Sequence, residues 1–259
     1  MKKLVLIAAM ATVTCFANAQ TTETAPLMTK NGIPITPQAG DWSLGFNAAP
    51  LLDYAGNMFN NASGNSASMA YQMPQTIEGK MMKTDNNACI GIVRIGFNSN
   101  SMNTLVPSST GSGVVTDNRK NSSTNIVLGA GEQWYRGKGR LKGYYGATAM
   151  LAFSSNDTSY SYGNALTSGS RVTQSNSGSG FGIGVRGFVG AEYFFAPKMS
   201  LAAEYGWGIM FNSVGQGKES VDSYNGTGVT STTTNTGSSS NFNVDVDNWG
   251  GAIILSLYF

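Results

Sequence analysis

The last eleven residues, Trp249-Gly-Gly-Ala-Ile-Ile-Leu-Ser-Leu-Tyr-Phe259, have a pattern that decides the fold. Every second residue falls on one apolar face with aromatic rings at both ends: Trp249, Gly251, Ile253, Leu255, Leu257 and Phe259. A period of two is typical of a β-strand, and about ten residues is the length with which a barrel strand crosses a bilayer. The stretch therefore predicts a transmembrane β-strand, with a strand of a soluble sandwich as the alternative.

The beginning of the chain reads as a secretory signal peptide. Two lysines follow Met1, an apolar run covers residues 4–16, and Ala17-Asn18-Ala19 forms a small-residue cleavage site. We therefore expect residues 1–19 to be removed before Gln20. A lipoprotein anchored at Cys15 is the alternative, but Thr14 precedes that cysteine where such motifs need a smaller residue.

The composition of the mature chain excludes several classes of protein. Without Lys2 and Lys3, 14 of the 16 basic residues remain against 14 acidic ones, so the net charge is zero and nothing suggests nucleic-acid binding. Charged residues make up 12% of the chain, against about 25% in soluble domains. No later apolar run reaches the roughly 18 residues of a membrane helix. Low charge and 33 glycines favour a barrel.

Alternation predicts eight strands after a polar segment. Residues 20–41 contain three prolines and read as an irregular periplasmic N-terminal segment, and residues 42–259 read as the barrel. The expected strands cover residues 42–49, 71–83, 88–98, 124–136, 141–153, 180–195, 201–211 and about 242–259. Cys89 is then the single thiol, so no internal disulfide can form.

The connections between these strands alternate in length. Short turns are expected near residues 85–87, 137–140 and 196–198, and long polar loops over residues 53–70, 99–123, 154–178 and 213–241. Short turns on one side and long loops on the other are typical of outer-membrane barrels. The fold prediction is an all-β, eight-stranded antiparallel up-and-down transmembrane β-barrel with four long extracellular loops, located in the cell outer membrane.

On these features the chain resembles the small eight-stranded barrels of the OmpA, OmpX and opacity-protein type. The stretches Lys30-Asn-Gly-Ile-Pro34 and Gly40-Asp-Trp-Ser-Leu-Gly45 are similar to uncharacterised outer-membrane barrel proteins of Bacteroidota. The chain differs from full-length OmpA because no peptidoglycan-binding domain follows Phe259. The resemblance implies that outer-membrane lipid and lipopolysaccharide surround the barrel. It also implies that the barrel insertion machinery reads a C-terminal signal made of Phe259, Leu257, Leu255 and Ile253.

Catalytic and cofactor motifs are weak or missing. The chain has no histidine, which excludes a Ser-His-Asp triad and histidine-ligated metals, so no enzyme activity, cofactor or catalytic residue is predicted. Gly182-Ile-Gly-Val-Arg-Gly187 fits a dinucleotide-binding pattern, but a strand follows where that motif needs a helix. Interior glycine in a narrow barrel is the preferred interpretation. Acidic residues near the last strand, Glu219, Asp222, Asp245 and Asp247, fit a divalent cation or a solvated strand end.

Charged residues on the inward faces predict a luminal network. Its members are Glu78, Lys80, Arg94, Glu132, Arg186, Glu192 and Glu204. Counting from the short turns places Glu78 about opposite Arg94, and makes Glu192 and Glu204 near neighbours. Because side chains just fill an eight-stranded barrel, this network should plug the lumen.

Function is predicted only by class. The leading hypothesis is a structural or surface-interaction protein whose long polar loops meet an unknown extracellular partner, and a narrow pore for small solutes is the alternative. Tyr160, Tyr162 and Tyr224 are candidate contact residues in the loops. Arg136, Lys138, Arg140 and Lys142 around the second short turn are expected to meet phospholipid headgroups or a dedicated partner.

Overall fold

A computed structural model describes residues 27–48, 76–245 and 252–259 of the chain. The predicted signal peptide, the first predicted long loop and Trp249 lie outside these ranges. Within them, no helix is long and apolar enough to cross a membrane.

The described residues form one antiparallel sheet of eleven strands. The strands are β1 (Trp42–Asn47), β2 (Thr76–Thr84), β3 (Asn87–Pro107), β4 (Val114–Arg136), β5 (Leu141–Ser161), β6 (Ser170–Ala196), β7 (Met199–Val214), β8 (Lys218–Tyr224), β9 (Val229–Asn235), β10 (Ser239–Asp245) and β11 (Ala252–Tyr258). Short turns join β2 to β3, β4 to β5 and β6 to β7 where the sequence predicts them.

Eight of the eleven strands close into a ring. Neighbours from β1 to β7 pair in chain order, and β11 pairs with both β7 and β1. The prediction of eight strands in all was wrong, because β8 and β9 lie where a loop was expected, and the predicted last strand contains most of β10 as well as β11. β10 pairs with β7 beyond the part of β7 that holds β11, and β8 pairs with the far end of β6.

Side chains alternate between the inside and the outside of the ring. Outward side chains are apolar and exposed, as in Trp42, Phe46 and Val185, whereas inward side chains are buried. The buried set mixes apolar residues near the short turns, such as Met82 and Phe194, with polar ones. An outward apolar face and an inward polar one reverse the usual arrangement of a soluble sheet.

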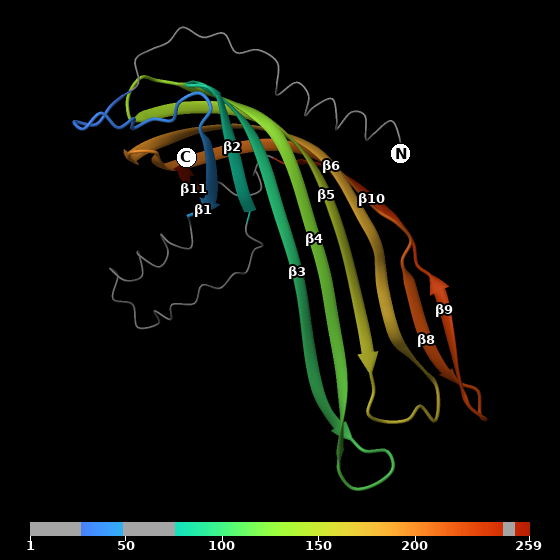
Figure 1. Cartoon of the computed structure of the whole chain (residues 1–259). Helices are drawn as coiled ribbons and strands as arrows, with labels where there is room; N and C mark the ends of the chain where they lie inside the picture. Colours follow the sequence, from blue (N-terminus) through green and yellow to red (C-terminus); the bar gives the residue numbers. More distant parts are fainter. Residues whose placement is uncertain (1–26, 49–75, 246–251) are drawn as a thin grey trace.

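The strands β3 to β6 run far beyond the ring, as Figure 1 shows. Together with β8 and β9 they form a curved sheet, here called the extension: residues 95–126 and 154–178 with β8 and β9. Ser, Thr and Asn dominate both faces, so no strand pattern was visible in the sequence. The predicted long loops at 99–123, 154–178 and 213–241 are therefore wrong. At the far end, residues 108–113 connect β3 to β4 and residues 162–169 connect β5 to β6, and β8 and β9 lie within 213–241.

Residues 27–40 lie across the short-turn end of the ring and form what we call the cap. A bridge between Met28 and Pro34 gives the cap a tight turn, and Ile35 enters the buried cluster at 3% exposure. Backbone bonds anchor it, because Lys198 N donates to Ile35 O at 3.0 Å and Gly40 N donates to Met82 O at 2.8 Å. The segment that we expected to be irregular thus covers one mouth of the ring.

Candidate functional site

The most densely bonded site lies inside the ring at Glu192, which is fully buried on β6. Tyr135 Oη and Tyr258 Oη each donate to its carboxylate at 2.8 Å, and Ser200 Oγ donates to it as well. Lys80 Nζ lies 3.5 Å from the same carboxylate. A buried carboxylate is tolerated only with such partners, so these five residues form one unit, here called the Glu192 cluster.

Three of these partners were missed by sequence reasoning. Tyr135 and Tyr258 come from β4 and β11, and closure of the ring brings them to β6. Ser200 lies on β7, the strand that follows β6 and pairs with it. The alternation did place Tyr258 on the face opposite the apolar one, which is the inward face. Tyrosine counts as an aromatic at a membrane rim in a sequence pattern, so its role as a hydrogen-bond donor was not recognised.

A second inward ion pair lies farther from the short turns. Arg186 on β6 donates to Glu204 on β7 at 2.6 Å, and both side chains are largely buried. Glu78 lies 3.2 Å from Lys80, so Lys80 contacts two carboxylates. Six predicted members of the luminal network face inward. Five of them form two groups: Glu78, Lys80 and Glu192 in one, Arg186 and Glu204 in the other. Arg94 shares the inward face of β3 with the buried Ala88 and Ile90.

Two parts of the predicted network are wrong. Glu132 points outward, where its carboxylate pairs with Lys83 at 2.7 Å and accepts a bond from Asn87 at 3.1 Å. It lies on the same face of β4 as Ile126 and Leu128, and the sequence already contained this signal.

The register between β2 and β3 also differs from the prediction. Glu78 lies opposite Ile92 instead of Arg94, and Arg94 forms no ion pair within the described residues. Glu192 and Glu204 are diagonal, because Glu192 faces Ala202 and Glu204 faces Gly190.

Inward glycines make room for large side chains. A Cβ at Gly190 would collide with the Tyr144 ring, and one at Gly206 would lie 2.6 Å from the Arg186 guanidinium. Gly182 likewise sits in β6, where a Cβ would lie 2.5 Å from Asn212 Oδ1. Gly184 is crowded in the same way, with Ile209 O 2.8 Å from a Cβ, whereas a Cβ at Gly187 would meet only Gly146 O at 4.0 Å. Gly182 and Gly184 therefore serve close packing inside a strand, as preferred over a dinucleotide site.

The two ends of the ring strands meet at Trp42 and Phe259. Their rings stack with centroids 4.6 Å apart, and Phe259 N donates to Trp42 O at 2.8 Å. β11 pairs with β1 through Leu255 and Leu257, whose side chains share the outward parity. The C-terminal residues thus close the ring, whereas their reading by insertion machinery stays a prediction.

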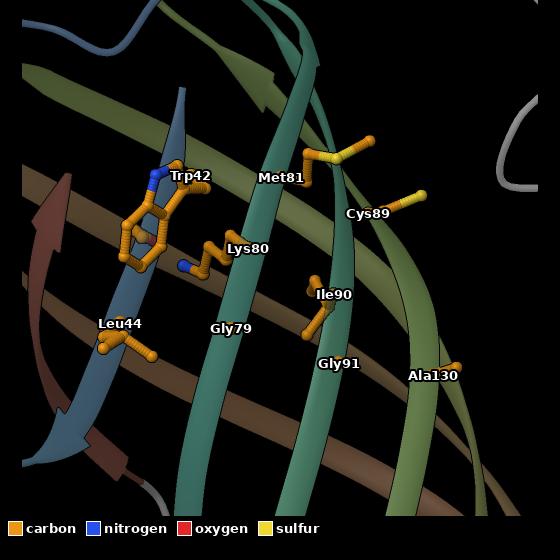
Figure 2. A pocket seen from close by; sticks show the side chains of 10 residues that line it. Trp42, Leu44, Gly79, Lys80, Met81, Cys89, Ile90, Gly91 and Ala130 are labelled. Atoms are coloured by element: carbon orange, nitrogen blue, oxygen red, sulfur yellow. The ribbon is translucent and has the colours of Figure 1, made fainter. Parts of the chain in front are cut away.

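A shallow apolar groove marks the outward face of β1 to β4 (Figure 2). It has a volume of about 420 Å³, with Trp42, Leu44 and Met81 at its sides. Small residues form its floor, namely Gly79, Gly91 and Ala130. The groove is mainly apolar, and Ser43, Lys80 and Cys89 also belong to its lining.

The extension holds one stack of aromatic and cationic side chains. Arg119 lies over Tyr160 at 5.8 Å, Tyr160 stacks on Tyr162 at 6.3 Å, and Arg171 lies over Tyr162 at 4.4 Å. Burial raises the pKa of Tyr162, and Arg171 opposes that change. The stack links β4, β5 and β6. Part of the surface of Tyr160 and Tyr162 is therefore already in contact with other side chains of the extension.

The acidic residues near the end of the chain do not gather into a site. Glu219 and Asp222 lie in β8 and Asp245 ends β10, while Asp247 is outside the described residues. Among the residues that the structure describes, no three acidic or sulfur ligands lie together as a metal site requires.

Comparisons with known proteins give little beyond this geometry. No protein-family profile matches the chain, and no curated protein matches it. One similar solved structure is the crystal structure of the outer membrane protein OprG from Pseudomonas aeruginosa, at 13% identity and a TM-score of 0.30. The alignment covers 87% of this chain and 98% of that one.

Proposed function

We propose that this chain is an outer-membrane β-barrel protein with a closed lumen, which acts as a rigid, non-enzymatic platform that presents the extension outside the cell. The observation that carries the proposal is the Glu192 cluster beneath the Arg186–Glu204 pair. Charged and tyrosine side chains from opposite sides of the ring meet there, so they occupy the interior that a pore would need.

The cap supports closure at the short-turn end. Ile35 lies in the same buried cluster as Tyr135 and Tyr258, and Asp41 beside the cap pairs with Lys198 at 2.9 Å. The cap and the Glu192 cluster therefore stack as two layers across one mouth. A solute moving through the ring would have to displace both.

The outward face supports placement in a bilayer. Exposed apolar side chains recur on successive strands, including Leu128, Phe153, Val189 and Tyr205. An apolar surface this continuous around a closed ring is costly in water and stable in lipid. The predicted signal peptide gives the route to that membrane.

Conductance of the refolded full chain in planar bilayers tests the closed lumen. Inserted protein is first verified by a heat-modifiable band and by protease resistance of the ring. We expect no steady channel from the inserted chain, because the two layers leave no continuous path. A reproducible open level in most insertions would overturn the proposal and favour the narrow pore.

The narrow pore stays as the second candidate on one observation. Gln133 is fully buried and faces inward, yet neither atom of its amide forms a hydrogen bond within the described residues. Thr148 and Tyr144 also have inward polar atoms without such a partner. Polar groups of this kind bind water, and small solutes pass through a pore along a continuous column of water.

A further inference from the structure

The short-turn end of the ring has more cations than free carboxylates. Its cations are Lys30, Lys83, Arg136, Lys138, Arg140, Lys142 and Lys198, and its acidic residues outside the ring are Asp41, Asp85 and Glu132. Each of these acids is already engaged: Asp41 with Lys198, Glu132 with Lys83, and Asp85 with Ala39 N at 2.9 Å. The remaining cations form no ion pair with a carboxylate among the described residues.

The unpaired charge concentrates at the turn between β4 and β5. Arg136, Lys138 and Arg140 are exposed there within five residues, around Gly137 at a φ of 122°. Arg140 donates from Nη1 to Phe195 O at 3.1 Å and to Phe194 O at 3.4 Å, and Arg136 donates from Nη2 to Tyr145 Oη at 3.3 Å. These bonds orient both guanidinium groups and leave their other N–H donors free, which suits the several oxygens of a phosphate.

Aromatic side chains adjoin the turn on the outward face. Trp134 and Tyr145 stack with centroids 5.6 Å apart, and Leu141, Tyr193 and Phe195 are exposed next to them along β5 and β6. Amphipathic aromatics beside cations are typical of the level where lipid headgroups meet acyl chains. Charge and apolar surface thus lie in the order in which a phospholipid presents its phosphate and its chains.

We propose that the β4–β5 turn is a binding site for an anionic phospholipid in the leaflet at the short-turn end. Arg136, Lys138 and Arg140 hold the phosphate, and the acyl chains lie along the outward face beside Tyr145 and Tyr193. The proposal deepens the membrane assignment made above and rests on it. It commits to a lipid, since a soluble phosphate compound would make no use of the adjoining aromatic surface.

The test compares lipid preference in two matched variants of the full chain. One variant removes three cations at the turn: Arg136→Gln, Lys138→Gln and Arg140→Gln. The control removes three in the extension: Arg119→Gln, Lys120→Gln and Lys218→Gln. Each protein is inserted into mixed vesicles of phosphatidylglycerol and phosphatidylcholine, extracted in mild detergent, and the lipids that stay bound are counted by native mass spectrometry.

We expect the unmodified chain and the control to retain phosphatidylglycerol over phosphatidylcholine by about tenfold, and the turn variant to lose that preference. Equal retention by all three proteins, or an equal loss in the control, would overturn the site. Displacement of the lipid by millimolar inorganic phosphate would also overturn it, because the site would then recognise phosphate alone. Failure of the unmodified chain to insert into the mixed vesicles would contradict the membrane assignment, whereas insertion without preference contradicts only this site.

Discussion

The ring and the extension share the same backbone ladder but differ in what their side chains bury. β4 runs through both regions, and its residues 114–134 pair without a break along β3. In the ring half, Val127, Gln133 and Tyr135 are buried, whereas in the extension half Arg119 and Lys120 are exposed. Continuous hydrogen bonding therefore does not show where the stability lies; burial and buried charge do.

The same difference separates the connections at the two ends. At the short-turn end the cap inserts an apolar side chain, and turn residues bond to neighbouring strands. At the far end the connection over residues 108–113 is exposed and bonds locally or to Asn164. We expect perturbations of the short-turn end to change the free energy of unfolding and perturbations of the extension to leave it nearly constant.

Removing a buried cation should have the largest effect. Lys80→Met leaves Glu192 and Glu78 without their cation, so we expect a loss of about 3 to 5 kcal/mol in the free energy of unfolding. The matched change Lys218→Met, at an exposed lysine of β8, should cost less than about 0.5 kcal/mol. Urea unfolding, followed by the heat-modifiable band in lipid vesicles, measures both.

The second half of the same cycle tests the pairing itself. The double variant with Lys80→Met and Glu192→Leu should lose less free energy of unfolding than the two single variants lose together. The reason is that neither member of this pair is left as a buried charge without the other. Additive losses would show that Lys80 and Glu192 do not stabilise each other.

Truncating the cap should have the next largest effect. Ile35→Ala removes most of a buried side chain and should cost about 2 to 4 kcal/mol. Ile33→Ala, two residues earlier in the same segment, changes a side chain that is 51% exposed and should cost little. The two variants are compared by the same urea titration. Equal midpoints would mean that the cap does not contribute to the stability of the ring.

Shortening the extension should have the smallest effect. Ser99 and Ser122 face each other across β3 and β4, so an Asn-Gly turn can replace residues 100–121. We expect the free energy of unfolding to change by less than about 1 kcal/mol, because the removed part buries little apolar surface. The urea midpoint of the shortened chain in vesicles measures this, and failure to fold would show that the extension supports the ring.

The sequence by itself determined the strands of the ring and their outward faces. Leu44, Ile253 and Leu255 alternate with polar or small residues, and this period of two does not depend on any distant part of the chain. The short turns could also be predicted from the sequence, since glycine, asparagine and proline favour turn conformations locally. The strands of the extension could not be predicted from the sequence. Ser, Thr and Asn on both faces give no alternation of apolar and polar residues, although the backbone groups still pair.

Only the tertiary structure decided which inward groups meet. The two tyrosine partners of Glu192 lie far along the chain, with Tyr135 57 residues away and Tyr258 66 residues away. Their meeting depends on closure of the ring and on the register of every pair of strands between them, and a shift of two residues is enough to exchange Arg94 for Ile92 opposite Glu78. Parity along a strand is a local property that the sequence contains, whereas contact across the interior is set by the geometry of the closed sheet.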